Sequence, residues 1–374
     1  MTTSSRNAVA RVEALCEAGL PAQPLIERLA EELKRAVRTD GFFIAATDPY
    51  TLLGLGAGIV HDMPGTVCQP FWSLEFEVPD YNKFADLAEG PQQVADLHAA
   101  TGGRPQRSAR WRELRTHMDA DAELRAAFTA GGRTWGVLHA TRSGGVGGFA
   151  PDEVAFVEAI APHVGRGLRA ALVAHPATNP VLRGPGMALL DAEQRLVSAT
   201  AEALAWFEEM ISVQRQPAPL LGTDVPSEAY IVAQEARSRA LDPSAPATAV
   251  RTRSCTRTGT WLLLHASCLR DADGGVEGTA LVVEPAKASE VAPLIVEAYA
   301  LTPREVDVTQ ALARGLSTSE IAARLHLSRY TVQDHLKAVY EKVGVSSRGE
   351  LVARMFADHY NDNLHYALHG AAAA

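Results

Sequence analysis

The spacing of apolar residues predicts that residues 1–175 form a first folded region of helices and strands. Apolar residues recur at intervals of three and four over 8–19 and 24–37, which predicts two amphipathic helices. Short apolar runs bounded by turn residues predict strands over 41–47, 52–60, 123–130 and 134–141. The last two strands flank Gly131-Gly132-Arg133, which indicates a hairpin. A helix is then predicted from Pro151 to about Val173, because proline and acidic residues favour its first turn.

A second region follows a change in composition. Residues 174–186 contain three prolines and two glycines, which is typical of a linker. Beyond it we expect strands over 187–190 and 195–198, a helix over 201–211, and strands over 250–256, 261–269 and 279–284. Strands, then helices, then strands is the order of an α+β domain. Residues 288–299 form a further helical pattern that leads into the last part of the chain.

The segment from residue 301 predicts four short helices, because residues that cap helices stand at regular positions. These capping positions are Thr302 with Glu305, Ser317 or Thr318, Ser328, and Ser347 with Glu350. Gly315 and Gly344 follow the first and third helices, where a left-handed residue commonly ends a helix. The second and third helices are joined by only three residues, 326–328, and the third, 329–343, is amphipathic. This arrangement predicts a helix-turn-helix.

The third helix has two distinct faces at 100° per residue. Val332, Leu336, Val339 and Val343 share one side and are predicted to pack inward. The opposite side carries Tyr330, Gln333, Asp334 and Lys337. A polar face of this kind fits a DNA major groove, which is about 12 Å wide and admits one helix.

Charge supports the same assignment. The chain has 374 residues and a net charge of −9, but the segment 301–374 contains eight acidic and eight basic residues and is therefore neutral. Any polyanion-binding surface is expected in this segment. A phosphate-binding G-x-x-x-x-G-K-[ST] loop, an H-E-x-x-H pair and a G-x-S-x-G sequence are all absent from the sequence. We therefore expect no catalytic residues, no cofactor and no metal.

Two resemblances concern the first 286 residues. The hairpin 123–141 and the Phe149-Ala150-Pro151-Asp152-Glu153 sequence are similar to the GAF family, and 187–197 is similar to the opening hairpin of the PAS family. They imply antiparallel sheets that enclose a small-molecule pocket or mediate dimerisation. The expected fold class is multidomain α+β, with two antiparallel-sheet sensor domains before an all-α four-helix domain. The expected limits are 1–175 (GAF-like), 184–286 (PAS-like), 287–300 (connecting helix), 301–360 (DNA-binding) and 361–374 (flexible tail).

The C-terminal segment resembles the LuxR-type DNA-binding domain. The resemblance rests on the sequences Leu301–Glu305, Gly315–Ala322, Leu327–Leu336 and Gly344–Leu351. It implies base-reading roles for Gln333, Asp334 and Lys337, with Tyr330 on the same face. It implies phosphate contacts by Ser328, Arg329, Thr331, Lys342, Ser347 and Arg348. Gln333 and Asp334 depart from the residues that are common in the family, which predicts an altered sequence preference rather than a loss of binding.

Aromatic residues suggest a candidate ligand pocket in the first region. An apolar lining with a few polar groups is typical of a small-molecule site. The candidate lining residues are Phe71, Trp72, Trp111, His117, Trp135 and His139. Ordinary packing in the core or a dimer interface is the alternative reading, and for each single residue it is the favoured one.

The sequence thus predicts a sequence-specific transcriptional regulator that binds promoter DNA as a homodimer. The LuxR resemblance implies an activator, and repression is the alternative. A small-molecule effector of unknown identity is expected, and RNA polymerase is left open as a partner. With no predicted membrane span or signal peptide, the expected location is the cytoplasm. One alternative is a constitutive DNA-binding dimer whose front domains bind no ligand. A more remote one is an enzyme with its active site in the first domain.

Overall fold

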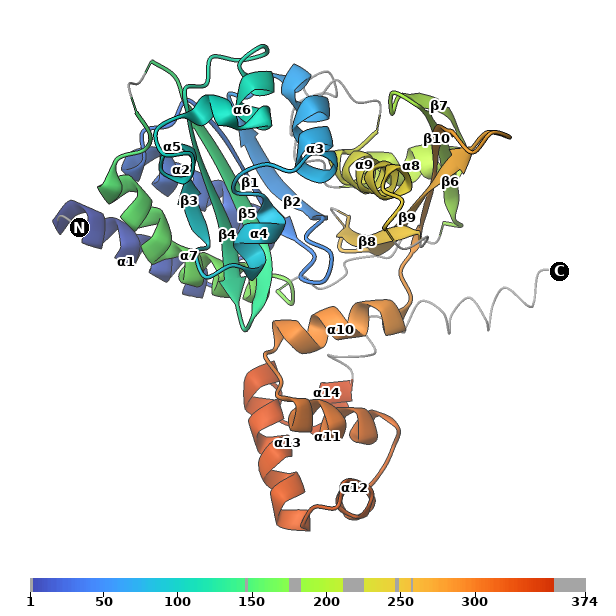
Figure 1. Ribbon diagram of the computed structural model, residues 1–374. Helices are drawn as coiled ribbons and strands as arrows, with labels where there is room; N and C mark the ends of the chain where they lie inside the picture. The colour runs from blue at the N-terminus through green and yellow to red at the C-terminus, as the bar shows by residue number, and fades with distance from the viewer. Residues whose placement is uncertain are drawn as a thin grey trace. The chain divides into compact units, whose positions relative to one another are not determined.

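The computed structural model describes residues 3–144, 147–174, 183–210, 225–245, 249–256 and 258–352, which fall into two compact units (Figure 1). The first unit contains the described residues up to Pro285, and the second contains those from Ala286 to Val352. No helix among the described residues is long and apolar enough to cross a membrane.

The first unit begins with an antiparallel five-stranded sheet in the order β2-β1-β5-β4-β3. Its strands are β1 (Gly41–Thr47), β2 (Gly54–His61), β3 (Val94–Asp96), β4 (Ala122–Ala130) and β5 (Arg133–Arg142). The predicted hairpin is confirmed, since β4 pairs with β5 and both turn glycines have a positive φ, 63° at Gly131 and 74° at Gly132. Only glycine adopts this backbone conformation readily.

Helices cover both faces of this sheet. One layer consists of α1 (Thr3–Glu17), α2 (Ala22–Ala36) and α7 (Pro151–Ala171), as expected from the apolar spacing. The other layer comes from the stretch between β2 and β4, for which the sequence pattern predicted no elements. It contains η1 (Gly65–Val67), α3 (Cys68–Glu77), α4 (Phe84–Glu89), α5 (Leu97–Ala100), η2 (Pro105–Arg107) and α6 (Ala109–Leu114). Phe43 of β1 packs against Phe71 of α3 and Phe84 of α4 in the core of this layer.

A second antiparallel five-stranded sheet has the order β7-β6-β10-β9-β8. Its strands are β6 (Gly186–Asp191), β7 (Leu196–Ala199), β8 (Val250–Cys255), β9 (Trp261–Arg270) and β10 (Val276–Pro285). Numbered within itself, each sheet has the order 2-1-5-4-3, so the two share one strand topology. Two helices accompany the second sheet, α8 (Ala201–Glu209) and α9 (Ser227–Leu241).

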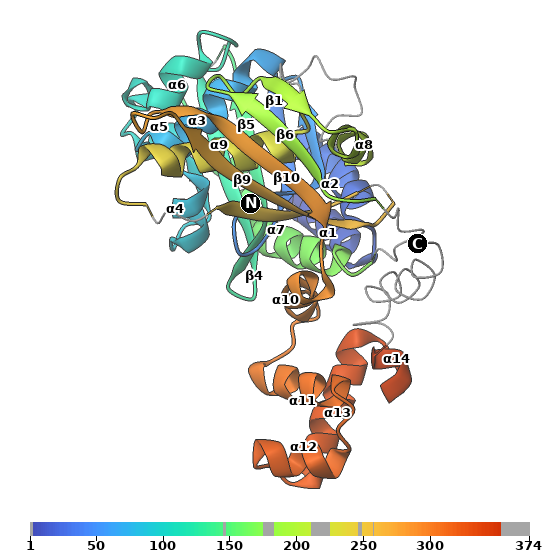
Figure 2. The ribbon, with the colours of Figure 1, turned by 90° about the vertical axis from the view of Figure 1, so that its right-hand side faces the viewer.

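Helix α9 lies between the two sheets. It packs against β8, β9 and β10 on one side and against β2 and α3 on the other (Figures 1 and 2). Gln234 of α9 donates hydrogen bonds to Glu77 Oε1 (2.7 Å) and Ser73 Oγ (3.1 Å) of α3. Strand β2 also approaches β8 so closely that a Cβ on Gly56 would lie 2.8 Å from the carbonyl oxygen of Cys255. These contacts join both sheets into one compact unit.

The second unit is entirely helical in its described part. It contains α10 (Ala288–Ala298), α11 (Pro303–Ala313), α12 (Thr318–Leu325), α13 (Arg329–Val343) and α14 (Arg348–Val352). The predicted fold class, two antiparallel sheets followed by an α-helical domain, is confirmed. Most of the predicted linker 174–186, the end of the fourth helix after 352 and the tail 361–374 lie outside the described residues.

Candidate nucleic-acid interface and ligand pocket

The helices of the second unit begin at the caps that the sequence predicts. The Oγ1 atom of Thr302 accepts a hydrogen bond from the amide of Glu305 (3.3 Å), and the Glu305 carboxylate accepts one from the amide of Thr302 (2.7 Å). Ser317 and Glu320 form a second reciprocal pair at the start of α12. Ser328 Oγ accepts the amide of Thr331 (3.0 Å) and starts α13. Such caps satisfy amides that have no partner within the helix.

The fourth helix differs in one detail from the predicted capping box. Ser347 Oγ accepts the amide of Glu350 (3.2 Å), as expected. The Glu350 carboxylate also accepts hydrogen bonds from the amide (2.7 Å) and hydroxyl (2.9 Å) of Ser346, which the sequence did not predict. Ser346 and Ser347 therefore both form hydrogen bonds with Glu350, whereas the sequence predicted Ser347 alone.

The turn between α12 and α13 has the geometry of a helix-turn-helix. His326 ends α12 in a left-handed conformation (φ 55°), which turns the chain within three residues. Ile321 of α12 is buried. The four inward positions predicted for α13 are also buried, namely Val332, Leu336, Val339 and Val343. The apolar face of α13 is thus fixed against its own domain.

The opposite face of α13 is open to solvent. Tyr330 is 73% exposed, and Gln333, Asp334 and Lys337 are also exposed. Gln333 and Asp334 each lie three or four residues from both Tyr330 and Lys337, so the four side chains share one side of the helix. The face carries amide, carboxylate, phenol and ammonium groups, all of which form hydrogen bonds with base edges or the sugar-phosphate backbone.

The six predicted phosphate contacts fall into two groups. Ser328, Arg329 and Ser347 are exposed, and Thr331 is half-buried at the start of α13. Lys342 Nζ donates hydrogen bonds to Glu305 Oε2 (2.6 Å) and to the carbonyl oxygen of Ala300 (3.1 Å). Arg348 donates to the carbonyl oxygen of Leu312 (2.8 Å) at the end of α11 and to that of Leu316 (2.9 Å) between α11 and α12. Lys342 and Arg348 therefore hold the domain together, a role that the sequence analysis missed.

Arg348→Met should separate this structural role from DNA binding. Loss of the guanidinium removes a donor from the half-buried carbonyl oxygens of Leu312 and Leu316, of which Leu312 keeps the Gly315 amide, so we expect the free energy of unfolding to fall by about 1–3 kcal/mol. Urea denaturation followed by circular dichroism measures this. Arg329→Met is the matched control, because Arg329 is exposed at the start of α13 and its loss should change stability by less than about 0.5 kcal/mol. Equal stability of the two variants would contradict the structural role.

The predicted ligand-pocket residues do not form one group in the structure. Phe71 and Trp72 pack edge to face, with ring centroids 5.1 Å apart, and His139 stacks on Phe43 at 5.5 Å. Trp111, His117 and Trp135 do not line the cavity that lies beside α3. Trp111 Nε1 donates to Asp121 O (2.9 Å), Trp135 Nε1 donates to Ala130 O (3.0 Å), and His117 Nε2 lies 3.4 Å from Glu113. Of the six, Phe71 and Trp72 line this cavity.

A buried network of charges fills the space between β4 and the helices α3 and α6. The Arg110 guanidinium binds both carboxylate oxygens of Glu123 (2.9 and 2.6 Å), and Arg125 Nη2 binds Glu75 Oε2 at 2.8 Å. All four side chains are 5% exposed or less. Burial raises the pKa of Glu123, but Arg110 outweighs it and lowers the pKa to about 2. Burial lowers the pKa of His139 to about 3, so this imidazole is neutral.

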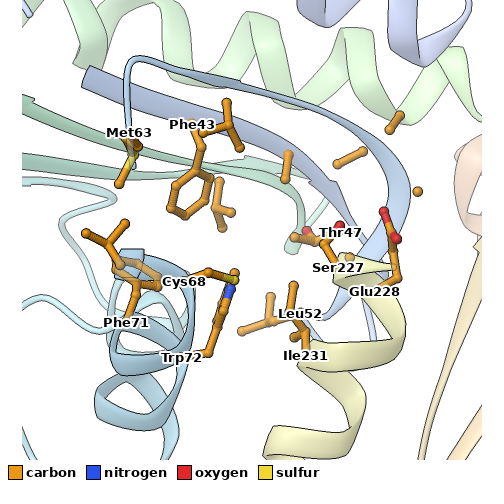
Figure 3. A pocket seen from close by; sticks show the side chains of 18 of the residues that line it. Phe43, Thr47, Leu52, Met63, Cys68, Phe71, Trp72, Ser227, Glu228 and Ile231 are labelled. Carbon is orange, nitrogen blue, oxygen red and sulfur yellow. The ribbon is translucent and has the colours of Figure 1, made fainter. Parts of the chain in front are cut away.

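The cavity that Phe71 and Trp72 line is bounded by β1, β2, β5, α3 and the first two turns of α9 (Figure 3). Phe71 and Trp72 reach it from α3, and Ser227, Glu228 and Ile231 reach it from α9. The α9 residues were not predicted, because no local pattern shows that a segment more than 150 residues away completes the wall of the cavity. Among the described residues, no group of three or more His, Cys, Asp or Glu side chains is placed to hold a metal ion.

The second unit has the form of a helix-turn-helix DNA-binding domain, and comparison with known proteins identifies its type. Residues 299–355 match the family described as "Bacterial regulatory proteins, luxR family". The protein therefore has a LuxR-type helix-turn-helix domain at its C-terminal end.

Curated relatives match over this domain. The chain is 51% identical over 53 residues to the probable transcriptional regulatory protein SgaR of Hyphomicrobium methylovorum, covering 14% of this chain and 25% of SgaR. It is 50% identical over 56 residues to the transcriptional regulatory protein UhpA of Escherichia coli, covering 15% of this chain and 29% of UhpA. The matches thus span less than a third of these relatives.

A structural comparison adds VqmA of Vibrio cholerae in complex with ligand and DNA. The match covers 48% of this chain and 83% of VqmA, with 21% identity and a TM-score of 0.24. Because the score is this low, we draw no conclusion from the match.

Proposed function

We propose that the protein is a DNA-binding transcriptional regulator whose α13 reads base edges in the major groove of promoter DNA. The observation that carries this proposal is the division of α13 into a buried apolar face and an exposed face with Gln333, Asp334 and Lys337. A glutamine pairs bidentately with adenine, and an aspartate accepts a hydrogen bond from cytosine N4. These two residues are expected to set the sequence preference, and Lys337 to add a contact with guanine or a phosphate.

A homodimer is the form that we propose for the DNA complex. The segment that carries α11–α14 has no net positive charge, so one copy gains little from phosphate attraction. Two copies on a two-part site double the number of base contacts, and the half-sites are then about 34 Å apart. In this proposal residues 1–175 and 184–286 respond to an effector, α10 connects them to the domain 301–360, and activation through RNA polymerase is the outcome.

Lys337→Ala tests the reading face, by which we mean the exposed side of α13 with Gln333, Asp334 and Lys337. We expect affinity for the specific site to fall by about 1–3 kcal/mol and preference to relax at one base position. The measurement is a DNase footprint together with a gel-shift titration at fixed salt. Lys34→Ala is the control, since it removes one lysine charge from α2, far along the chain from the reading face. A footprint and affinity equal to those of the unmodified protein would remove Lys337 from the proposed site.

A constitutive DNA-binding dimer is the second candidate. It is favoured by the positions of the six predicted pocket residues, since Phe71 and Trp72 line the cavity and the other four do not. Gel-shift titrations with and without a cell-extract metabolite fraction separate the two candidates. DNA affinity that never changes with metabolites supports the constitutive form.

A further inference from the structure

The cavity between the first sheet and the helices α3 and α9 is apolar on almost every side (Figure 3). Its volume is about 70 Å³, and its apolar lining includes Phe43, Leu52, Met63, Trp72 and Ile231. Gly54 and Gly56 of β2 also border it and add no side chain to its wall. A lining of this kind favours a hydrocarbon group over a polar one.

One side of the cavity is chemically different. Glu228 is only 1% exposed, and neither of its carboxylate oxygens completes a hydrogen bond with any described residue. The buried Ser227 hydroxyl is also without a completed hydrogen bond in the described part of the chain. Both residues belong to the first turn of α9, which follows Pro226 and has no side-chain cap. Buried polar groups in folded proteins are otherwise almost always paired, so this pair of residues needs a partner.

We propose that this cavity binds a small ligand with a protonated amine on an apolar chain, and that Glu228 is the counter-ion of the amine. An ionised carboxylate only accepts hydrogen bonds, whereas an ammonium group donates three. The two Glu228 oxygens and the Ser227 oxygen together offer three acceptors from one helical turn. An anionic ligand would place a like charge beside Glu228, and a neutral one would leave the carboxylate charge uncompensated.

The titration of Glu228 agrees with this assignment. Burial raises its pKa to about 7, although its own amide and the Ser227 hydroxyl, which are close but do not reach full hydrogen-bond geometry, act in the opposite direction. An ammonium group at hydrogen-bond distance would restore the ionised form. The Glu228 carboxyl group is therefore expected to lose its proton when the amine binds.

The size of the cavity limits the ligand. A volume of about 70 Å³ is roughly twice the ~30 Å³ that a water molecule occupies in the liquid, so it holds the amine and the first carbons of a chain. Longer chains have to extend past half-buried lining residues such as Val60 and Trp72. Short primary alkylamines are accordingly the appropriate probes.

Calorimetric titration of the full chain at pH 8 tests the proposal with n-hexylamine, 1-hexanol and hexanoate. The amine should bind at least about tenfold more tightly than the alcohol or the acid, which is the effect of one hydrogen bond to a charged group. Glu228→Gln keeps the shape of the side chain and should weaken amine binding by at least about tenfold. Ser227→Ala should weaken it less, because the carboxylate remains.

Glu235→Gln is the matched control, since Glu235 lies on α9 but binds Arg239 and does not line the cavity. It should leave amine binding unchanged. Three results would overturn the proposal: equal affinity for the three probes, amine binding that is unchanged in Glu228→Gln, or no binding of hexylamine at millimolar concentration. No DNA is present in this assay, so its outcome is independent of the proposed DNA-binding function.

Discussion

Arg110→Met should lower the free energy of unfolding by about 3–5 kcal/mol, because it leaves buried carboxylates without their counter-ion. Arg110 is 0% exposed and binds both oxygens of Glu123, and its Nη1 lies 3.8 Å from Asp80 Oδ2. Methionine has a similar length and is apolar, so the change removes the charge without opening a large cavity. Urea denaturation at pH 7, followed by tryptophan fluorescence and circular dichroism, measures the loss.

The pH dependence provides a second readout for this variant. The pKa of Glu123 is depressed to about 2 in the folded protein, so its pairing stabilises the fold above the unfolded pKa of about 4.5, and this contribution is lost as pH falls toward 2. The difference between the unmodified protein and Arg110→Met should therefore shrink between pH 5 and pH 3. Arg112→Met is the control, because Arg112 makes an exposed hydrogen bond to the Gln106 carbonyl. Identical unfolding curves for both variants would contradict this account of the network.

The second unit was largely predictable because its signals are local. Thr302 and Glu305 act on each other within one helical turn and pair as predicted, and Ser328 caps α13 as predicted, through the amide of Thr331. The division of α13 into two faces also follows from spacing alone. Its tertiary hydrogen bonds were not predictable. Lys342 reaches back 37 residues to Glu305, and no short-range pattern in the sequence encodes that partner.

In the first unit the strands and outer helices were predictable from the sequence, but the buried ion pairs between them were not. Glu123 and Arg125 occupy alternate positions of β4 and so point to one face of the sheet. Two charges on one face of an otherwise apolar strand were a signal of buried pairing. Their partners Arg110 and Glu75 come from α6 and α3, and only the tertiary structure brings them together.

Helix α9 was not predicted from the sequence, because it is buried on several sides. It contacts the second sheet on one side and β2 and α3 on the other, so its buried positions include Glu228, Tyr230, Val232 and Gln234. Apolar residues therefore do not recur on one stripe, which is the pattern that predicts an amphipathic helix. The same environment leaves Glu228 beside a cavity, where its role depends on the surrounding fold.

Glu228→Gln should raise the free energy of unfolding at pH 8 by about 3 kcal/mol and leave it nearly unchanged at pH 4. The pKa of Glu228 is raised to about 7 in the folded protein, chiefly by burial, while in the unfolded chain it is about 4.5. A raised carboxyl pKa means that the folded state retains its proton longer. Ionisation therefore costs stability as pH rises from about 4.5 to 7, and the cost is constant above that range.

Glutamine resembles the protonated acid in shape and carries no charge, so the variant avoids this cost at every pH. Thermal and urea denaturation across pH 4–8 measure the difference between the two proteins. Glu89→Gln is the control, because Glu89 is exposed at the end of α4 and its replacement should shift stability by less than about 0.5 kcal/mol. The difference in free energy of unfolding between Glu228→Gln and the unmodified protein is the decisive quantity. If this difference stays constant from pH 4 to pH 8, Glu228 does not carry an uncompensated charge. Hexylamine at saturating concentration should reduce this difference in free energy of unfolding at pH 8, because it stabilises the ionised form of the unmodified protein alone.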